Sequence, residues 1–389
     1  MLPPHLAHLP APPADALALS SALEKQIVSE IQASGGQISF ARYMELALYA
    51  PGLGYYSAGS AKLGPAGDFV TAPEISPLFA QCVARQVAQL IASGIAVVIE
   101  VGAGSGAFAG DVLRTLAASG RLPERYLILE VSGDLRERQR EHLALIVPDL
   151  MSRVQWLEVL PASVDAVLIA NEVLDAIPAH LIRTRDGRIE EGVVGLKSAG
   201  SGFEQSYRPA TAALVSATKG LELPDDYETE VNLAARAFVK SFAARIERGA
   251  LLFIDYGFPA AEYYHSQRAR GTLMCHYRHH AHDDPFVLPG LQDITAHVDF
   301  TAIAAAGVAA GHSVLGYTAQ AQFLINCGIT NILTETRPDD ARAYAPLAAQ
   351  AQKLLSPAEM GELFKVLAIG RGIDMPLLGF TRGDRTHTL

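Results

Sequence analysis

The chain has 389 residues; half of them are hydrophobic, 19% are charged, and the net charge at pH 7 is −10. This length predicts two lobes, or one domain with large insertions. The negative charge argues against a general nucleic-acid-binding protein, which would present a basic face. Three widely spaced cysteines indicate neither a disulfide framework nor a zinc site.

The first residues contain no basic segment followed by an apolar block, and the most apolar stretches of the chain carry charged residues and many small ones. Neither a signal peptide nor a membrane span is therefore expected. We expect a cytoplasmic protein that does not insert into a membrane.

Residues 1–92 are interpreted as an extension of helices and loops that covers a cofactor site. Apolar residues between Leu23 and Ile31 form a helical stripe, and Ser39 can cap the next short helix. A long loop rich in glycine and proline follows over residues 50–76. Ser76-Pro77 then offers an N-cap and a proline in the first turn of another helix.

Strands and helices alternate from residue 97 onward. Apolar runs and helical periodicity predict, in chain order, a strand at 97–101, a helix at 108–118, a strand at 126–131, a helix at 135–146, and strands at 154–157 and 166–170. This alternation predicts a parallel sheet with right-handed crossovers, so the expected fold class is α/β.

Residues 93–389 are interpreted as this α/β core with two insertions. The alternation is lost over about 188–230 and again over about 258–297. Between them, an amphipathic helix is predicted at 232–246 and a buried strand at 250–256, which ends in an acid and a glycine.

Three alternating glycines follow the first predicted strand. Gly102, Gly104 and Gly106 remove Cβ where the backbone must turn tightly and approach a ligand, so we predict a cofactor loop. The spacing alone fits a dinucleotide loop as well. Glu100 favours S-adenosyl-L-methionine, because a carboxylate beside the loop would repel a pyrophosphate and attract ammonium and sulfonium charges.

Acidic side chains also follow later strands, where ligands of an open parallel sheet bind. Glu130 lies 28 residues after Gly102 and is predicted to accept hydrogen bonds from ribose hydroxyls. The alternative is a charge that the dipole of the following helix stabilises. Asp255 ends the strand at 250–256.

The segment from Asn171 to Pro178 follows an apolar strand and carries an amide and two acids, Glu172 and Asp175. We predict that Asn171, Glu172 and Asp175 are catalytic. If the acceptor is a guanidinium, paired carboxylates localise its charge away from the nitrogen that attacks the methyl group. Solvated acids at a helix start are the alternative interpretation.

The loop before Ser76 has two compatible interpretations. Thr71-x-x-Glu74 matches a capping box, and Thr71, Glu74 and Asp68 can also line the cofactor and acceptor site. A histidine-rich segment, 276–284, contains metal-ligand side chains, but their spacing matches no closed zinc site and no metal is expected.

Seven motifs carry a resemblance to a known family: Ile38–Tyr56, Gly67–Ser76, Glu100–Gly106, Asn171–Pro178, Asp255–Gly257, Asp293–Phe300 and Gly361–Leu367. With them, the chain resembles the MidA family of class I S-adenosylmethionine-dependent methyltransferases over most of its length. The resemblance implies a Rossmann-like methyltransferase fold with added helices, and S-adenosyl-L-methionine as the cofactor.

The resemblance also implies methylation of protein arginine, as in mitochondrial relatives that act in complex I assembly. The partner would be a protein substrate, either a respiratory complex I subunit or another protein. Two further functions stay open: an assembly chaperone that retains the cofactor site, and an NAD-dependent oxidoreductase, for which no hydride-transfer pair is evident. Nothing in the sequence indicates the oligomeric state.

Overall fold

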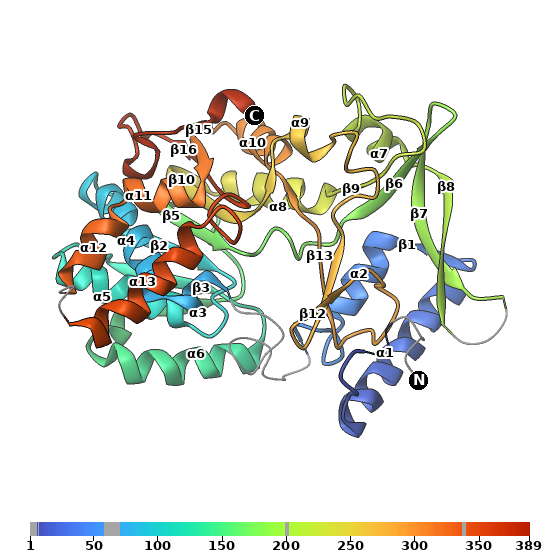
Figure 1. Cartoon of the computed structure of the whole chain (residues 1–389), viewed down its shortest axis with the longest axis horizontal. Coiled ribbons are helices and arrows are strands. Elements are labelled where there is room, and N and C mark those ends of the chain that lie inside the picture. The colour runs from blue at the N-terminus through green and yellow to red at the C-terminus, as the bar shows by residue number, and fades with distance from the viewer. Residues whose placement is uncertain (1–5, 7, 58–70, 199–201, 337–339) are drawn as a thin grey trace. The chain divides into compact units, whose positions relative to one another are not determined.

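The computed structural model describes residues 6, 8–57, 71–198, 202–336 and 340–389, and its elements divide between two units (Figure 1). The first unit comprises residues 1–69, 175–236 and 261–297. The second comprises residues 70–174, 237–260 and 298–389. Each unit is thus assembled from three separate stretches of sequence.

The second unit is built on an eight-stranded sheet of order β15-β16-β10-β5-β2-β3-β4, with β14 paired to β10. Its strands are β2 (Val97–Val101), β3 (Arg125–Leu129), β4 (Val154–Leu157), β5 (Val164–Asn171), β10 (Ile246–Phe258), β14 (Val298–Asp299), β15 (Ser313–Ala319) and β16 (Phe364–Arg371). Within the described sheet, β16 alone runs antiparallel to its neighbours β10 and β15, and the other pairs are parallel. The predicted α/β fold is confirmed. The strands predicted between residues 97 and 170 pair in parallel, and the sheet as a whole is mixed because of β16.

Helices cover both faces of this sheet. They are α3 (Ala72–Ile75), α4 (Pro77–Ala92), α5 (Ala107–Ala118), α6 (Gly133–Ile146), α10 (Phe300–Ala309), α11 (Gln320–Asn326), α12 (Ile329–Glu335), α13 (Ala341–Leu355) and the 3-10 turns η2 (Pro148–Arg153), η3 (Leu378–Phe380) and η4 (Thr386–Thr388). Alternate strand side chains, such as Val98 and Val167, join one core with α4, α5 and α11. On the other face α10 packs so closely that a Cβ on Gly307 would lie 2.3 Å from Cδ1 of Ile369. In Figure 1, α4 and α12 lie side by side although they are far apart in sequence.

Helix starts follow the capping residues that the sequence offers. The Ser39 hydroxyl accepts a hydrogen bond from the backbone N–H of Arg42, and the Ser76 hydroxyl accepts one from Leu78 (both 3.2 Å). Pro77 occupies the first turn of α4, where no N–H is needed. These two predicted helix starts are confirmed.

The first unit is made of helices and antiparallel strands. It contains α1 (Ala14–Ala33), β1 (Gln37–Ser39), α2 (Phe40–Tyr49), β6 (His180–Arg185), β7 (Arg188–Leu196), β8 (Phe203–Pro209), α7 (Ala212–Ala217), β9 (Glu228–Val231), β11 (Met274–Tyr277), β12 (His280–His282) and β13 (Asp293–Thr295), while α8 (Leu233–Ala243) and α9 (Ala260–Tyr263) span the limits between units. Its sheets have the orders β1-β7-β6-β9, with β8 paired to β7, and β12-β11-β13. The predicted stripe on α1 is buried at Leu23, Ile27 and Ile31 in a core shared with α2.

The sequence is interpreted as an extension over residues 1–92 and a core over residues 93–389. In the structure, several segments pack in the other unit than this division suggests. Helix α4 lies in the second unit because Phe79, Val83 and Val87 are buried in the core of the large sheet. Almost all residues of the two predicted insertions belong to the first unit, together with β6, which begins before residue 188. The domain limits themselves stay a prediction.

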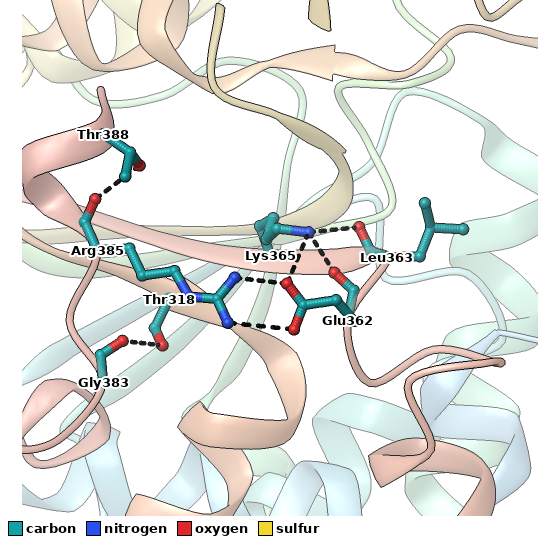
Figure 2. A network of polar contacts seen from close by, with 7 residues as sticks. All are labelled: Thr318, Glu362, Leu363, Lys365, Gly383, Arg385 and Thr388. Carbon is teal, nitrogen blue, oxygen red and sulfur yellow. Dashed lines mark hydrogen bonds and ion pairs between the residues drawn. The ribbon is translucent and has the colours of Figure 1, made fainter. Parts of the chain in front are cut away.

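Polar contacts fasten the C-terminal segment to the large sheet (Figure 2). The Arg385 guanidinium binds both carboxylate oxygens of Glu362 (2.5 and 3.2 Å), and the Thr318 hydroxyl donates to the Gly383 carbonyl (2.7 Å). Lys365, on β16, donates to the carbonyl oxygens of Glu362 and Leu363. The last residues of the chain are therefore part of the second unit. Among the described helices, none combines the length and the hydropathy that a membrane span needs.

Candidate functional site

The glycine loop directly follows β2, as the sequence predicts. Gly102, Gly104 and Gly106 all have positive φ (+69°, +54° and +85°), which side chains with a Cβ rarely adopt. A Cβ on Gly102 would also lie 3.1 Å from Cγ2 of Val173. Gly106 is the N-cap of α5, and the first N–H of that helix, at Ala107, donates to the Ser105 hydroxyl (3.3 Å).

Asn171 and Glu172 lie next to this loop. Val101, the last residue of β2, pairs with Ala170 of β5, so the residues that leave both strands are neighbours at the carboxyl edge of the sheet. The structure therefore brings the predicted cofactor loop and two of the three predicted catalytic residues together within the second unit.

Glu172 has a left-handed backbone with φ +52°. A non-glycine residue in this region costs about 1–2 kcal/mol, and such strain is concentrated at functional sites. The Glu172 N–H donates to the Ile254 carbonyl (2.9 Å), and its Oε1 accepts from the backbone N–H of Ala72 (3.3 Å) and from Asn171 Nδ2 (3.2 Å). The turn thus holds the carboxylate at the sheet edge.

The Asn171 side chain complements this carboxylate. Its Nδ2 is used by Glu172, while its Oδ1 is buried and accepts no hydrogen bond from the residues that the structure describes. A buried amide oxygen without a donor is costly, and such groups are explained by a ligand or by water. The site therefore offers a free acceptor beside the Glu172 carboxylate.

Asp255 supports the same turn from β10. Its carboxylate is buried and accepts hydrogen bonds from the backbone N–H groups of Val173 (3.2 Å), Leu174 (2.9 Å) and Tyr256 (2.9 Å). The acid that ends this predicted strand thus fixes the backbone that follows Glu172.

Asp175 belongs to the first unit, whereas Asn171 and Glu172 belong to the second. Its carbonyl accepts a hydrogen bond from Ala296 (3.0 Å), and its carboxylate is one of the charges that, after burial, raise the pKa of Tyr49. Asp175 and Glu172 are therefore residues of different units, and the catalytic role of Asp175 stays a prediction.

Glu74 contacts the glycine loop through Ser105, whose hydroxyl donates to Glu74 Oε1. The capping box that Thr71 and Glu74 could form is absent at Thr71, whose side chain makes no cap hydrogen bond to the described helix α3. The N–H of Glu74, which a Thr71 cap would bind, donates to the backbone carbonyl of Thr71 (3.0 Å), and Glu172 accepts from the first N–H of α3, at Ala72. Asp68 lies outside the described residues.

Glu130 directly follows β3 and is 7% exposed. Its Oε1 accepts from the Ser132 N–H (2.9 Å) and its Oε2 from Gln139 Nε2 (3.3 Å). Burial raises the pKa of Glu130, although the hydrogen bond from the Ser132 N–H opposes this change. The carboxylate is thus held in one orientation.

The Glu100 side chain is more deeply buried than the sequence suggests. Its carboxylate is 4% exposed and accepts a hydrogen bond from the Tyr126 hydroxyl (2.6 Å). Burial raises the pKa of Glu100 to about 7, against the opposing effect of the Tyr126 bond, and the negative charge of Glu130 raises it further. Near neutral pH this acid is therefore only partly ionised in the ligand-free chain.

Gln139 is a site residue that sequence reasoning missed. It lies on α6, is fully buried, and contacts Glu130 as well as the glycine loop. One feature of the sequence could have indicated that Gln139 is buried: it lies four residues before Leu143, the other buried residue of α6. This spacing places both side chains on the inner face of the helix.

The histidine-rich segment forms β11, β12 and their turn. Within the part of the chain that the structure describes, no group of three or more His, Cys, Asp or Glu side chains is arranged to hold a metal ion.

Comparisons with known proteins give a consistent result. Residues 78–318 match the model of a family described as S-adenosyl-L-methionine-dependent methyltransferases. A crystal structure of a Burkholderia thailandensis protein bound to S-adenosyl-homocysteine has 53% sequence identity and a TM-score of 0.95, and the match covers 98% of this chain and 100% of that one.

Curated relatives match over most of their length. The mitochondrial protein arginine methyltransferase NDUFAF7 of Danio rerio is 29% identical, with 93% of both chains covered, and its Drosophila melanogaster homolog is 29% identical, with 92% of this chain and 88% of the homolog covered. These relatives and that of Mus musculus are named mitochondrial proteins, and this finding contradicts the expected cytoplasmic location.

Proposed function

The chain belongs to the family of S-adenosyl-L-methionine-dependent methyltransferases, and we propose that its acceptor is an arginine side chain of a protein. Family membership confirms the resemblance seen in the sequence, the methyltransferase fold and the cofactor, and it favours S-adenosyl-L-methionine over the NAD alternative. The names of the curated relatives support arginine as the acceptor.

We assign cofactor binding to the glycine loop and to the acids around it. The residues fit the group: Gly102, Gly104 and Gly106 all have positive φ, and a Cβ on Gly102 would lie 3.1 Å from Cγ2 of Val173, so the loop has no side chains where a ligand approaches it. Glu130 would bind the ribose hydroxyls, and Glu100 would favour the cationic part of the cofactor. Glu74 and Thr71 would border the same loop.

We assign the acceptor side to Glu172 and Asn171. When bound, the cofactor supplies an electrophilic methyl group. The Glu172 carboxylate would accept hydrogen bonds from guanidinium nitrogens that do not react, so that positive charge stays on them and the reacting nitrogen keeps its lone pair. The Asn171 oxygen would accept another guanidinium hydrogen and hold the group in line for attack.

One observation carries this assignment: the strained backbone of Glu172, which holds a carboxylate beside the glycine loop and beside a buried amide oxygen that no described residue satisfies. Solvated acids at a helix start would need neither the positive φ nor the bond to the α3 N–H. A complex I subunit is one candidate for the acceptor protein.

Incubation of the full chain with methyl-labelled S-adenosyl-L-methionine and cell lysate is expected to label a protein, and mass spectrometry of that protein should find the added methyl group on arginine. A matched reaction with excess S-adenosyl-homocysteine serves as the control. Label on another side chain or on a nucleic acid would contradict the arginine proposal, whereas cofactor binding without any labelled product would favour the assembly chaperone.

Replacing Glu130 by glutamine is expected to weaken S-adenosyl-homocysteine binding by about 10- to 100-fold, because hydrogen bonds to a charged acceptor contribute roughly 1.5–3 kcal/mol. Titration calorimetry would measure the dissociation constant. Glu137→Gln is the control, since Glu137 also lies on α6 and forms an exposed ion pair with Arg140. An unchanged dissociation constant in Glu130→Gln would remove the ribose role.

A further inference from the structure

The Gln139 side chain connects three separate strand ends of the second unit. Its Nε2 donates to the carbonyl of Gly104 in the glycine loop (2.9 Å) and to Oε2 of Glu130 at the end of β3 (3.3 Å). Its Oε1 accepts from Nε1 of Trp156 on β4 (2.8 Å). Both donor hydrogens and one acceptor position of the amide are therefore used.

The position of Gln139 is fixed by packing as well as by these bonds. The residue is fully buried, and a Cβ on Gly106 would lie 3.5 Å from its Cα and Cγ. The loop glycine that precedes α5 thus lies directly against the backbone of α6 at Gln139. A buried amide with all these partners cannot rotate without leaving polar groups unsatisfied.

The three partners of Gln139 lie on different elements: the glycine loop, the segment that follows β3, and β4. Gly104 belongs to the loop, and Glu130 would bind the ribose. Trp156 is partly buried and carries the guanidinium of Arg140 at 4.8 Å from its ring centroid, so both its indole N–H and one ring face are occupied by α6 residues. Rotation of the Gln139 side chain would therefore disturb Gly104, Glu130 and Trp156 together.

We propose that Gln139 is a positioning residue for the adenosine half of the cofactor. It acts through Glu130, the Gly104 peptide and Trp156, and this inference rests on the assignment of the glycine loop and Glu130 to cofactor binding. Gln139 sets the orientation of the Glu130 carboxylate from one side while the Ser132 N–H sets it from the other. None of the hydrogen bonds described for Gln139 involves Asn171 or Glu172, so we confine the role of Gln139 to cofactor affinity.

Gln139→Leu in the full chain is expected to raise the dissociation constant of S-adenosyl-homocysteine about 10- to 100-fold. The KM for S-adenosyl-L-methionine should rise in parallel, while kcat at saturating cofactor stays within about twofold, because the acceptor side is intact. Trp156 is the only tryptophan of the sequence. Loss of its hydrogen bond should therefore shift the intrinsic fluorescence of the ligand-free protein.

Gln86→Leu is the matched control. Gln86 is also fully buried, and its partners are Gln89 and the N–H of Gly379, neither of which belongs to the loop. This variant should lower the melting temperature but leave the dissociation constant and the Trp156 emission unchanged. Gln139→Glu is a second test that does not depend on whether Gln139→Leu folds. Glutamate has nearly the same shape as glutamine but places an acceptor where the donor faces Glu130, so this variant is expected to bind S-adenosyl-homocysteine more weakly at pH 8.

Dissociation constants within twofold of the unaltered chain in the folded Gln139 variants would overturn the positioning role. A weakening as large in Gln86→Leu would overturn it too, because it would show a general effect of instability. Failure of the unaltered chain to bind S-adenosyl-homocysteine would instead overturn the assignment of the cofactor residues on which this role rests.

Discussion

The Glu172→Ala variant is expected to lose methyl transfer by roughly 10²- to 10⁴-fold while it still binds S-adenosyl-homocysteine. The physical reason is that the carboxylate would orient the acceptor guanidinium and localise its charge, and neither task concerns the bound cofactor. Single-turnover rates with a labelled protein acceptor measure the first quantity, and titration calorimetry measures the second.

Two further substitutions separate the chemistry of Glu172 from its strained backbone. Glu172→Gly also removes the carboxylate but relieves the positive φ, so it should be about 1 kcal/mol more stable than Glu172→Ala and equally inactive. Glu124→Gln is the control for loss of an acid, because Glu124 is exposed at the amino end of β3. Transfer at the normal rate in Glu172→Ala would rule out the proposed acceptor role.

The Glu100→Gln variant is expected to stabilise the ligand-free protein at pH 8 by up to roughly 3 kcal/mol. The folded-state pKa of Glu100 is about 7, above the ordinary value of 4.5. Between these values the folded chain holds a proton that the unfolded chain has released, so the free energy of unfolding falls as pH rises through this window. Glutamine keeps an acceptor for the Tyr126 hydroxyl and has no charge to bury.

Urea unfolding of both proteins from pH 5 to pH 8 tests this expectation. The difference between them should be small at pH 5 and largest at pH 8. The ionised carboxylate that destabilises the fold should strengthen cofactor binding. The affinity of the unaltered chain for S-adenosyl-L-methionine should therefore fall as pH drops below about 7, by at most tenfold per pH unit. In Glu100→Gln the affinity should not depend on pH over this range. A stability difference that does not depend on pH would show that Glu100 is not a buried charge.

The elements of the second unit were predictable because their signals are local. The strand Val97–Val101, the helix Pro77–Ala92 and the glycine turn each follow from a short apolar run or from a capping residue. The same reasoning placed Asn171 and Glu172 beside the loop, since the carboxyl ends of parallel strands share one edge.

Other features depend on contacts that no local pattern encodes. A strand buried on both faces, such as Val97–Val101, does not reveal that the Glu100 carboxylate is buried against the Tyr126 hydroxyl. The antiparallel direction of β16 and the place of Asp175 in the first unit are set by pairings between distant residues. Gln139 was overlooked because a glutamine on a polar helix is normally solvated.

The discontinuous make-up of both units bears on how the chain folds during synthesis. β1 pairs with β7, which begins about 150 residues later, and β11 and β13 of the same unit come later still. At about 5–20 residues per second, the ribosome needs on the order of ten seconds between the first partner and the second. Phe203, Cys275 and Ile294 complete the core that α1 and α2 begin, so we expect the nascent chain to expose apolar surface and to need protection from aggregation until these residues have been made.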